Sequence, residues 1–158
     1  MDSVCFLYGN YTAIFTDSVE QNVFPWSGGW AITSEDAHTG TFSITDSPFS
    51  PYQPNFGNTL TLASPIDLNN YSSAYLTFYA KWSIEPDFDY AQVLVSQNGG
   101  PYQALPGQYT KAGGAGVPVT GEPLYDGTQN AWVKEQMDLS AFAGSQISIQ
   151  FLMQSDGF

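Results

Sequence analysis

The stretch Ile147-Ser148-Ile149-Gln150-Phe151-Leu152-Met153-Gln154 decides the fold class of this chain. Apolar residues occupy every second position from Ile147 onward, and most of the positions between them are polar. This period of two predicts a β-strand with one buried face, because successive side chains of a strand point to opposite sides. Residues 74–82 alternate in the same way and predict a second strand, one face of which is formed by Leu76, Phe78, Ala80 and Trp82.

Similar runs recur along the chain, whereas no stretch of ten or more residues has the periodicity of an amphipathic helix. We predict further strands at residues 4–8, 12–15, 30–33, 41–45, 59–62, 90–96, 102–105 and 132–139. The pair Asn98-Gly99 is typical of a tight hairpin turn. Many short strands joined by such turns predict an all-β protein, a two-sheet antiparallel β-sandwich of the jelly-roll kind. The interval 108–130 is too long for a hairpin and predicts a loop that crosses one end of the sandwich.

The charge of the chain is strongly one-sided. Its 158 residues carry fifteen carboxylates against three lysines and no arginine, which gives a formal net charge of −12. Such a surface repels phosphate groups, so we expect neither nucleic acid nor an anionic membrane as a partner. No apolar segment approaches the length of a membrane span. A hydrophobic fraction of 42% favours one folded core over a disordered acidic chain.

Three carboxylates, Glu85, Asp87 and Asp89, lie within five residues of one another between two predicted strands. Like charges about 4 Å apart repel by about 1 kcal/mol per pair in water and about 4 kcal/mol at a protein-like dielectric constant. The cluster is therefore either spread into solvent or shared by a cation, and calcium is the ion that prefers such oxygen ligands. Zinc is not expected, because the chain has a single histidine and no His-Glu-x-x-His motif.

A second set of acidic residues offers further candidate calcium ligands. Asp17 and Glu20 follow an apolar strand, and Asp46 lies in a turn before a proline. The alternative is a structural role, because an aspartate in such a position often accepts a hydrogen bond from the backbone of its own turn. The residues alone leave both interpretations open.

Four aromatic residues in predicted loops support a different hypothesis. Flat rings at a surface can stack on sugars, and the rings in question belong to Trp26, Tyr52, Tyr109 and Tyr125. Carbohydrate binding is therefore an alternative function. An enzyme is not expected: paired carboxylates suggest a glycosidase, but a single loop rarely brackets a substrate, and no activated nucleophile accompanies these acids.

Several short strings occur in a set order along the chain. They include Ile14-Phe15-Thr16-Asp17-Ser18-Val19-Glu20, Gly29-Trp30, Thr45-Asp46-Ser47-Pro48, Ile66-Asp67-Leu68, Trp82-Ser83-Ile84-Glu85, Asp87-Phe88-Asp89-Tyr90, Tyr125-Asp126-Gly127, Asp138-Leu139-Ser140 and residues 151–156. Together these strings resemble the MAM-like jelly-roll accessory domain of secreted bacterial metallopeptidases, those of the immune inhibitor A type and the carboxypeptidase T-like enzymes. The resemblance extends over residues 14–158.

The resemblance implies where the domain begins and which residues join the ion site. Residues 1–15 resemble the terminal strand of a preceding β-domain or a linker, so we expect the MAM-like domain at residues 16–158. Asp156 lies in the last string, and the resemblance adds it to the predicted calcium ligands. In the family a strand beyond the position of Phe158 carries a paired aspartate, so we expect the final strand of the sandwich to be missing.

The function that the resemblance implies is not catalytic. We expect a calcium-stabilised accessory module of a secreted or cell-surface multidomain peptidase, serving in positioning, adhesion or contact with a substrate or surface. Its expected partners are the catalytic and neighbouring domains of the parent chain, with a polysaccharide or a surface protein as further candidates. A carbohydrate-binding module of the same architecture is the alternative.

Overall fold

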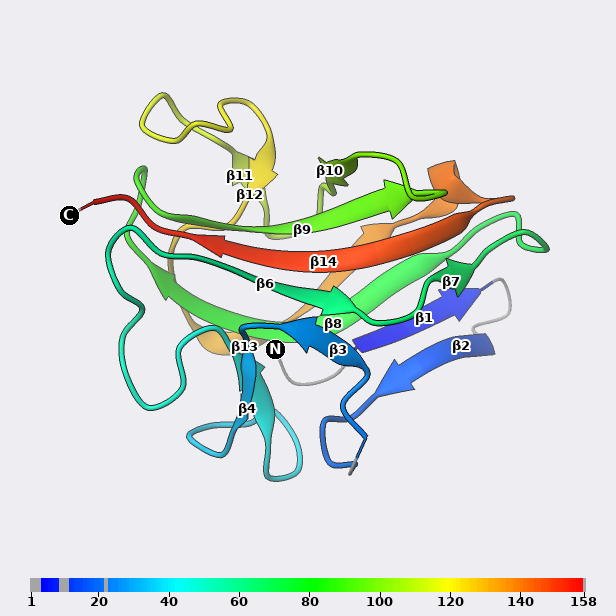
Figure 1. Cartoon of the computed structure of the whole chain (residues 1–158), viewed down its shortest axis with the longest axis horizontal. Coiled ribbons are helices and arrows are strands. Elements are labelled where there is room, and N and C mark those ends of the chain that lie inside the picture. The colour runs from blue at the N-terminus through cyan, green and yellow to red at the C-terminus, as the bar shows by residue number, and fades with distance from the viewer. Residues whose placement is uncertain (1–3, 9–11, 22, 158) are drawn as a thin grey trace.

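The computed structural model describes residues 4–8, 12–21 and 23–157, whose strands form two main sheets packed as a sandwich (Figure 1). The smaller sheet has the strand order β13-β8-β1-β2. Its strands are β1 (Val4–Tyr8), β2 (Thr12–Asp17), β8 (Tyr75–Ile84) and β13 (Gly127–Asp138). Strand β8 pairs with β13 along nearly its whole length, and the described residues of β1 pair with it through residues 75–78.

The larger sheet has the strand order β10-β9-β14-β6-β3, and β7 pairs with one end of β14. Its strands are β3 (Trp26–Gly28), β6 (Gly57–Leu62), β7 (Ile66–Asp67), β9 (Tyr90–Gln97), β10 (Tyr102–Ala104) and β14 (Gln146–Gln154). Two small hairpins join β4 (Ala31–Thr33) to β5 (Ser43–Thr45) and β11 (Lys111–Ala112) to β12 (Pro123–Leu124). A 3-10 helix, η1 (Ser140–Phe142), precedes β14. Among the described residues no helix is long and apolar enough to cross a bilayer.

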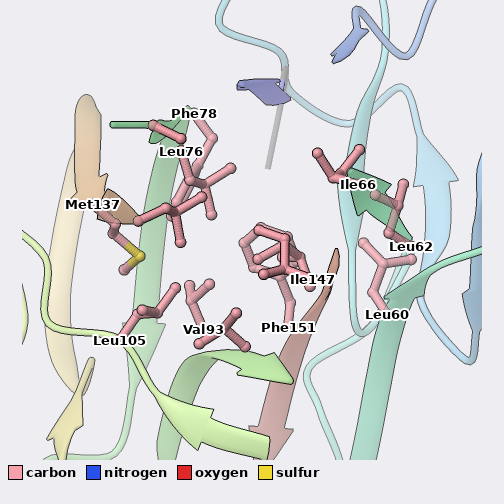
Figure 2. Packing of buried hydrophobic residues seen from close by; sticks show 14 of the residues in the cluster. Leu60, Leu62, Ile66, Leu76, Phe78, Val93, Leu105, Met137, Ile147 and Phe151 are labelled. Atoms are coloured by element: carbon pink, nitrogen blue, oxygen red, sulfur yellow. The ribbon is translucent and has the colours of Figure 1, made fainter. Parts of the chain in front are cut away.

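The core fills the space between the two sheets, and Figure 2 shows side chains from both meeting there. Leu76 and Phe78 on β8 pack toward Ile147 and Phe151 on β14. The Phe151 ring is the centre of an aromatic cluster, with the ring centroid of Phe78 at 5.2 Å and that of Trp26 at 5.7 Å. The alternation that predicted the two strands therefore also predicted which of their faces are buried.

The predicted all-β antiparallel sandwich is confirmed, and each predicted strand is present. The Asn98-Gly99 turn is also confirmed: both residues have positive φ, 50° and 73°, and β9 pairs with β10 as a hairpin. The sequence did not predict β3, β7, β11 and β12, which have two or three residues each. Such short elements carry too few positions for a period of two to be visible. The interval 108–130 contains β11, β12 and the beginning of β13 rather than one uninterrupted loop.

The first described strand belongs to the smaller sheet. Strand β1 lies between β8 and β2, and Val4 is in register with Phe78 on one side and with Asp17 on the other. The expected break at Gly9-Asn10 falls outside the described residues. The assignment of residues 1–15 to a preceding domain or a linker stays a prediction, although β2 runs without interruption across the expected boundary at residue 15.

Candidate metal centre

The acidic segment predicted from the sequence forms the turn between β8 and β9. Ile84 ends β8 as a buried residue, and the backbone N–H of Asp89 donates to the carbonyl oxygen of Glu85 at 3.2 Å. Asp87, in the middle of the turn, has a φ of 71°. Backbone in this left-handed region turns the chain sharply, so the three carboxylates of the turn do not follow a common direction.

Three of the predicted ligands come together at this end of the sandwich. One carboxylate oxygen each from Glu85, Asp89 and Asp156 lies within 4.8 Å of the other two. Glu85 follows β8 in one sheet, whereas Asp89 precedes β9 and Asp156 follows β14 in the other. The register that pairs Gln154 with Tyr90 brings Asp156 to Asp89. Glu85 is exposed, Asp156 is half-buried and Asp89 is only 2% exposed, so the cluster extends from the surface inward.

Asp89 is held in place by its neighbours. Its Oδ1 accepts the backbone N–H of Asp156 at 2.7 Å, and its carboxylate accepts a hydrogen bond from the Tyr52 hydroxyl. The Tyr52 hydroxyl oxygen in turn accepts the backbone N–H of Glu85 at 3.0 Å. Burial, together with the nearby Asp89 carboxylate, raises the pKa of Tyr52, so this hydroxyl stays protonated at neutral pH and remains a donor.

These carboxylates suit a hard cation. Within the described part of the chain, no lysine forms an ion pair with Glu85 or Asp89. Calcium takes six to eight oxygen ligands in flexible geometry, and three carboxylates at one rim can supply several of them. The donor set contains no sulfur and no imidazole, so it does not fit zinc. The residues present therefore fit the calcium ion that the sequence led us to expect.

Asp87, the other predicted ligand in the turn, faces different partners. Its backbone N–H donates to Oδ2 of Asp126 at 2.9 Å, and its Oδ1 lies 3.6 Å from the Lys111 ammonium group. Lys111 makes a closer ion pair, 2.6 Å, with Oδ1 of Asp126. The hydrogen bond that Lys111 donates to Asp126 is the main reason that the pKa of Lys111 is raised. Asp87 is thus part of a structural ion-pair group and stands outside the three-carboxylate cluster.

The predicted pair Asp17 and Glu20 is engaged in hydrogen bonds within the fold. Both oxygens of the buried Asp17 have donors, the backbone N–H of Val19 at 2.8 Å and the indole N–H of Trp26 at 2.7 Å. Oε1 of Glu20 accepts the backbone N–H groups of Thr41 and Phe42, each at 2.8 Å. These contacts match the structural alternative that the sequence left open. Neither residue is among the described groups of acids close enough to share an ion.

Asp46 lies after β5 and belongs neither to the cluster of Glu85, Asp89 and Asp156 nor to the ion-pair group of Asp87. It is half-buried, and its Oδ2 is shielded from solvent without a hydrogen-bond partner among the described residues. Nothing in the sequence distinguished this aspartate from a turn residue that caps its own backbone.

The four aromatic residues predicted to lie in loops divide into two kinds. The loop placement was wrong for Trp26, which begins β3, whereas Tyr125 lies between β12 and β13 in an isolated bridge with Ala91; the two are buried, at 5% and 6% exposure. The Tyr125 hydroxyl donates to Oε2 of Glu135 at 2.8 Å, and burial is the main reason that the pKa of Tyr125 is raised. Tyr109 is exposed and Tyr52 is half-buried beside the acidic cluster. The Trp26 ring is enclosed in the core, whereas Tyr125 lines a cleft between the two sheets.

Sequence analysis overlooked Glu135, the most deeply buried acid of the described residues, at 1% exposure. Its oxygens accept the backbone N–H groups of Gln108, Gln136 and Tyr109 at 2.7, 2.7 and 3.0 Å, besides the Tyr125 hydroxyl. A glutamate at an inward position of a strand, as here in β13, was the available signal. It was missed because β13 alternates weakly around its bulge.

Comparison with known proteins identifies the family of the domain that contains the carboxylate cluster. A family model described as the MAM domain of immune inhibitor A-like proteins matches residues 45–158. The chain belongs to this family. The matched region contains Glu85, Asp89 and Asp156 as well as Asp46 and Tyr52, so the carboxylate cluster lies wholly inside the MAM-like domain.

Two peptidases are similar to parts of this chain. Bacillopeptidase F of Bacillus subtilis is 26% identical over 131 residues, which are 83% of this chain and 8% of that protein. The pre-pro-metalloprotease PrtV of Vibrio cholerae is 33% identical over 96 residues, which are 61% of this chain and 10% of that protein. The chain thus spans a tenth or less of these longer relatives and corresponds to an accessory domain, not to a catalytic one.

Proposed function

We propose that this chain is a non-catalytic accessory module of a secreted multidomain peptidase, stabilised by calcium and serving to position the catalytic domain or to hold a substrate or surface. The observation that carries the proposal is the family match over residues 45–158, combined with the small share of each peptidase that the chain represents. A module of this size acts beside other domains, so its expected partners are the catalytic and neighbouring domains of the parent chain.

The calcium part of the proposal is supported by the convergence of Glu85, Asp89 and Asp156. The three carboxylates follow or precede strands of both sheets, so an ion bound by all three would join the sheets at this rim. Without a cation the same geometry places like charges close together, which costs free energy. An ion that binds the folded chain alone would stabilise it by about 2.7 kcal/mol at a concentration one hundred times its dissociation constant.

Thermal unfolding of the whole chain tests the calcium part. In calcium at one hundred times the dissociation constant, we expect the melting temperature to rise by about 5–10 °C above its value in chelator. Magnesium at the same concentration should have a smaller effect, because it requires a stricter octahedral geometry. Equal melting curves in calcium and in chelator would reject a stabilising ion.

The accessory role has a separate test. The reading frame that encodes this chain is expected to continue into a peptidase catalytic domain, and the chain alone should not hydrolyse peptide, ester or glycoside substrates. Turnover by the isolated chain would contradict the proposal. Carbohydrate binding has less support, since two of the four candidate rings, Trp26 and Tyr125, are only 5% and 6% exposed.

A further inference from the structure

A cleft of about 490 Å³ opens between the two sheets beside the acidic turn. Phe78 and Trp82 on β8 form one wall, and Val93 on β9 with Phe151 on β14 forms the other. Residues 44–47 and 51–52 also line the cleft. The volume lies in the range of about 300–1,000 Å³ that is typical of ligand sites, which combine mostly apolar walls with a few polar groups.

Two tryptophan rings in the cleft are fixed by contacts on their other sides. The indole N–H of Trp82 donates to the carbonyl oxygen of Asp126 at 3.1 Å, and its ring centroid lies 5.0 Å from that of Tyr125. The indole N–H of Trp30 donates to the carbonyl oxygen of Asn58 at 3.3 Å. Because both N–H groups are already used, these rings offer a ligand their π surfaces, which attract cations.

Asp46 brings a negative charge to this largely apolar cleft. Its Oδ2 is buried and, in the described part of the chain, has no donor. A buried acceptor left without a partner is unfavourable, and more so when it is charged. The two oxygens share one negative charge, so a cation that reaches the carboxylate from the cleft neutralises the charge of both. A positively charged hydrogen-bond donor makes the strongest bond to such a carboxylate.

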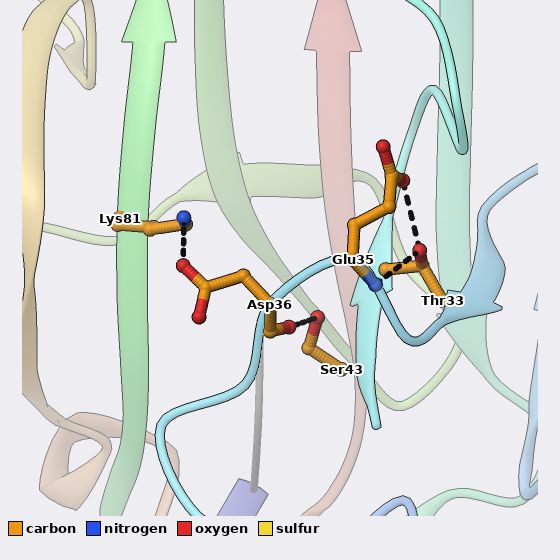
Figure 3. Close-up of polar contacts among 5 residues, drawn as sticks. All are labelled: Thr33, Glu35, Asp36, Ser43 and Lys81. Atoms are coloured by element: carbon orange, nitrogen blue, oxygen red, sulfur yellow. Dashed lines mark hydrogen bonds and ion pairs between the residues drawn. The ribbon is translucent and has the colours of Figure 1, made fainter. Parts of the chain in front are cut away.

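The lysine that lines the cleft already has another partner. The Lys81 ammonium group is paired with the Asp36 carboxylate (Figure 3) and lies 5.6 Å from the ring centroid of Trp132. The hydrogen bond from Lys81 lowers the pKa of Asp36, so this carboxylate is charged at neutral pH. The chain has no arginine, and its net charge of −12 attracts positively charged partners. A cation for Asp46 is therefore to be sought in another molecule.

We propose that this cleft is a binding site for an arginine side chain presented by a partner peptide segment. The guanidinium group pairs with the Asp46 carboxylate, and its plane packs on the ring of Trp82 or Trp30. Arginine fits better than lysine, because its guanidinium group is planar, stacks on aromatic faces and is more weakly hydrated. The proposal concerns Asp46 and the cleft and does not require calcium.

A titration of the isotope-labelled whole chain with the tripeptide amide acetyl-Gly-Arg-Gly-NH2, followed by NMR, tests the proposal. The indole N–H signals of Trp30 and Trp82 should shift, whereas that of Trp26, which does not line the cleft, should not. The same peptide with citrulline in place of arginine is nearly isosteric but uncharged, and we expect it to bind at least about tenfold more weakly.

Matched variants locate the charge that is responsible. Asp46→Asn should remove most of the preference for arginine over citrulline, whereas Asp67→Asn, which neutralises an exposed carboxylate on β7, should preserve it. The proposal is overturned if the two peptides bind equally or if the arginine peptide shifts neither indole signal. It is also overturned if cellotetraose shifts both signals and the arginine peptide does not, because the cleft is then a sugar site. The peptide comparison uses the unmodified chain, so it decides the matter even if Asp46→Asn does not fold.

Discussion

Two buried aspartates, Asp89 and Asp17, lie in opposite surroundings. Both oxygens of Asp17 accept hydrogen bonds from donors of the same chain, one from a backbone N–H and one from an indole. Asp89 likewise accepts a backbone N–H and the Tyr52 hydroxyl, but its neighbours include two other carboxylates within 4.8 Å. Burial therefore does not separate a structural acid from a candidate ion ligand. What separates them is whether donors or further acceptors surround the carboxylate.

Glu135 extends this comparison, because it is buried as deeply as Asp89 and has donors on both of its oxygens. Glu135 and Asp17 are expected to stabilise the fold in any buffer. The cluster of Glu85, Asp89 and Asp156 is expected to do so only when a cation is present. Substitutions that neutralise one acid at a time test this distinction.

The largest effect is expected for Glu135→Gln. The substitution places an amide NH2 against buried donors, which are then left without an acceptor. Each buried group left unsatisfied costs about 1–3 kcal/mol. The free energy of unfolding should therefore fall by about 2–4 kcal/mol. Urea denaturation should give the same loss in calcium and in chelator. Glu122→Gln, at an acid that accepts one 3.2 Å hydrogen bond from Gln92, is the control and should cost less. A loss of stability seen only in calcium would mean that Glu135 acts as an ion ligand and not as a structural acid.

The next effect, for Asp89→Asn, is expected to depend on the buffer. In calcium at one hundred times the dissociation constant, the variant should lose up to about 2.7 kcal/mol of stability, which is the contribution of the bound ion. In chelator the loss should be smaller, because the removal of one of three mutually repelling charges offsets the weakening of the hydrogen bonds that Asp89 accepts from Asp156 and Tyr52. Paired urea curves measure both values. Equal losses in the two buffers would make Asp89 a structural acid like Asp17.

Asp17→Asn should cost about 1–2 kcal/mol in both buffers, because it weakens a buried hydrogen bond to a charged acceptor. A double-mutant cycle with Trp26→Phe isolates that bond, since the indole N–H is absent from both Phe variants. The coupling should have the same size with and without calcium. Additive effects of the two substitutions would mean that the 2.7 Å contact contributes nothing to stability.

The smallest effect is expected for Asp87→Asn. The residue is an exposed member of an ion-pair group, and such pairs are typically worth less than about 1 kcal/mol. Asparagine also tolerates the positive φ of 71° at this position. Calorimetric titration should find calcium affinity within about threefold of the wild type, a difference of less than 1 kcal/mol. A loss of affinity as large as that of Asp89→Asn would bring Asp87 into the ion site.

The fold was predictable because its longest strands carry clear alternation. Residues 74–82 and 147–154 marked both sheets and their buried faces, and the Asn98-Gly99 pair marked a hairpin that the structure contains. The order of the strands could not be predicted, because pairing depends on contacts between residues far apart in the chain. Strand β14 pairs with β6 and β9, which precede it by fifty residues or more.

The candidate site was predictable in part for the same reason. The spacing of Glu85, Asp87 and Asp89 indicated one cluster, but Asp87 has a left-handed backbone, and its carboxylate lies near Lys111 instead. Asp156 was expected only from family resemblance, and it reaches Asp89 through the register of two strands. The polar groups of the buried Trp26 and Tyr125 donate hydrogen bonds to Asp17 and Glu135, which lie nine and ten residues away in the sequence. No local sequence pattern reveals these contacts.

Tyr52 belongs to both the carboxylate cluster and the cleft. Its hydroxyl group contacts Glu85 and Asp89, whereas the residue also lines the cleft that contains Asp46. If the proposed ion shifts this side chain, it also alters the cleft wall, and the two proposed sites would then be joined by thermodynamic linkage. Whatever factor calcium imposes on affinity in the cleft, an occupant of the cleft imposes the same factor on affinity for calcium.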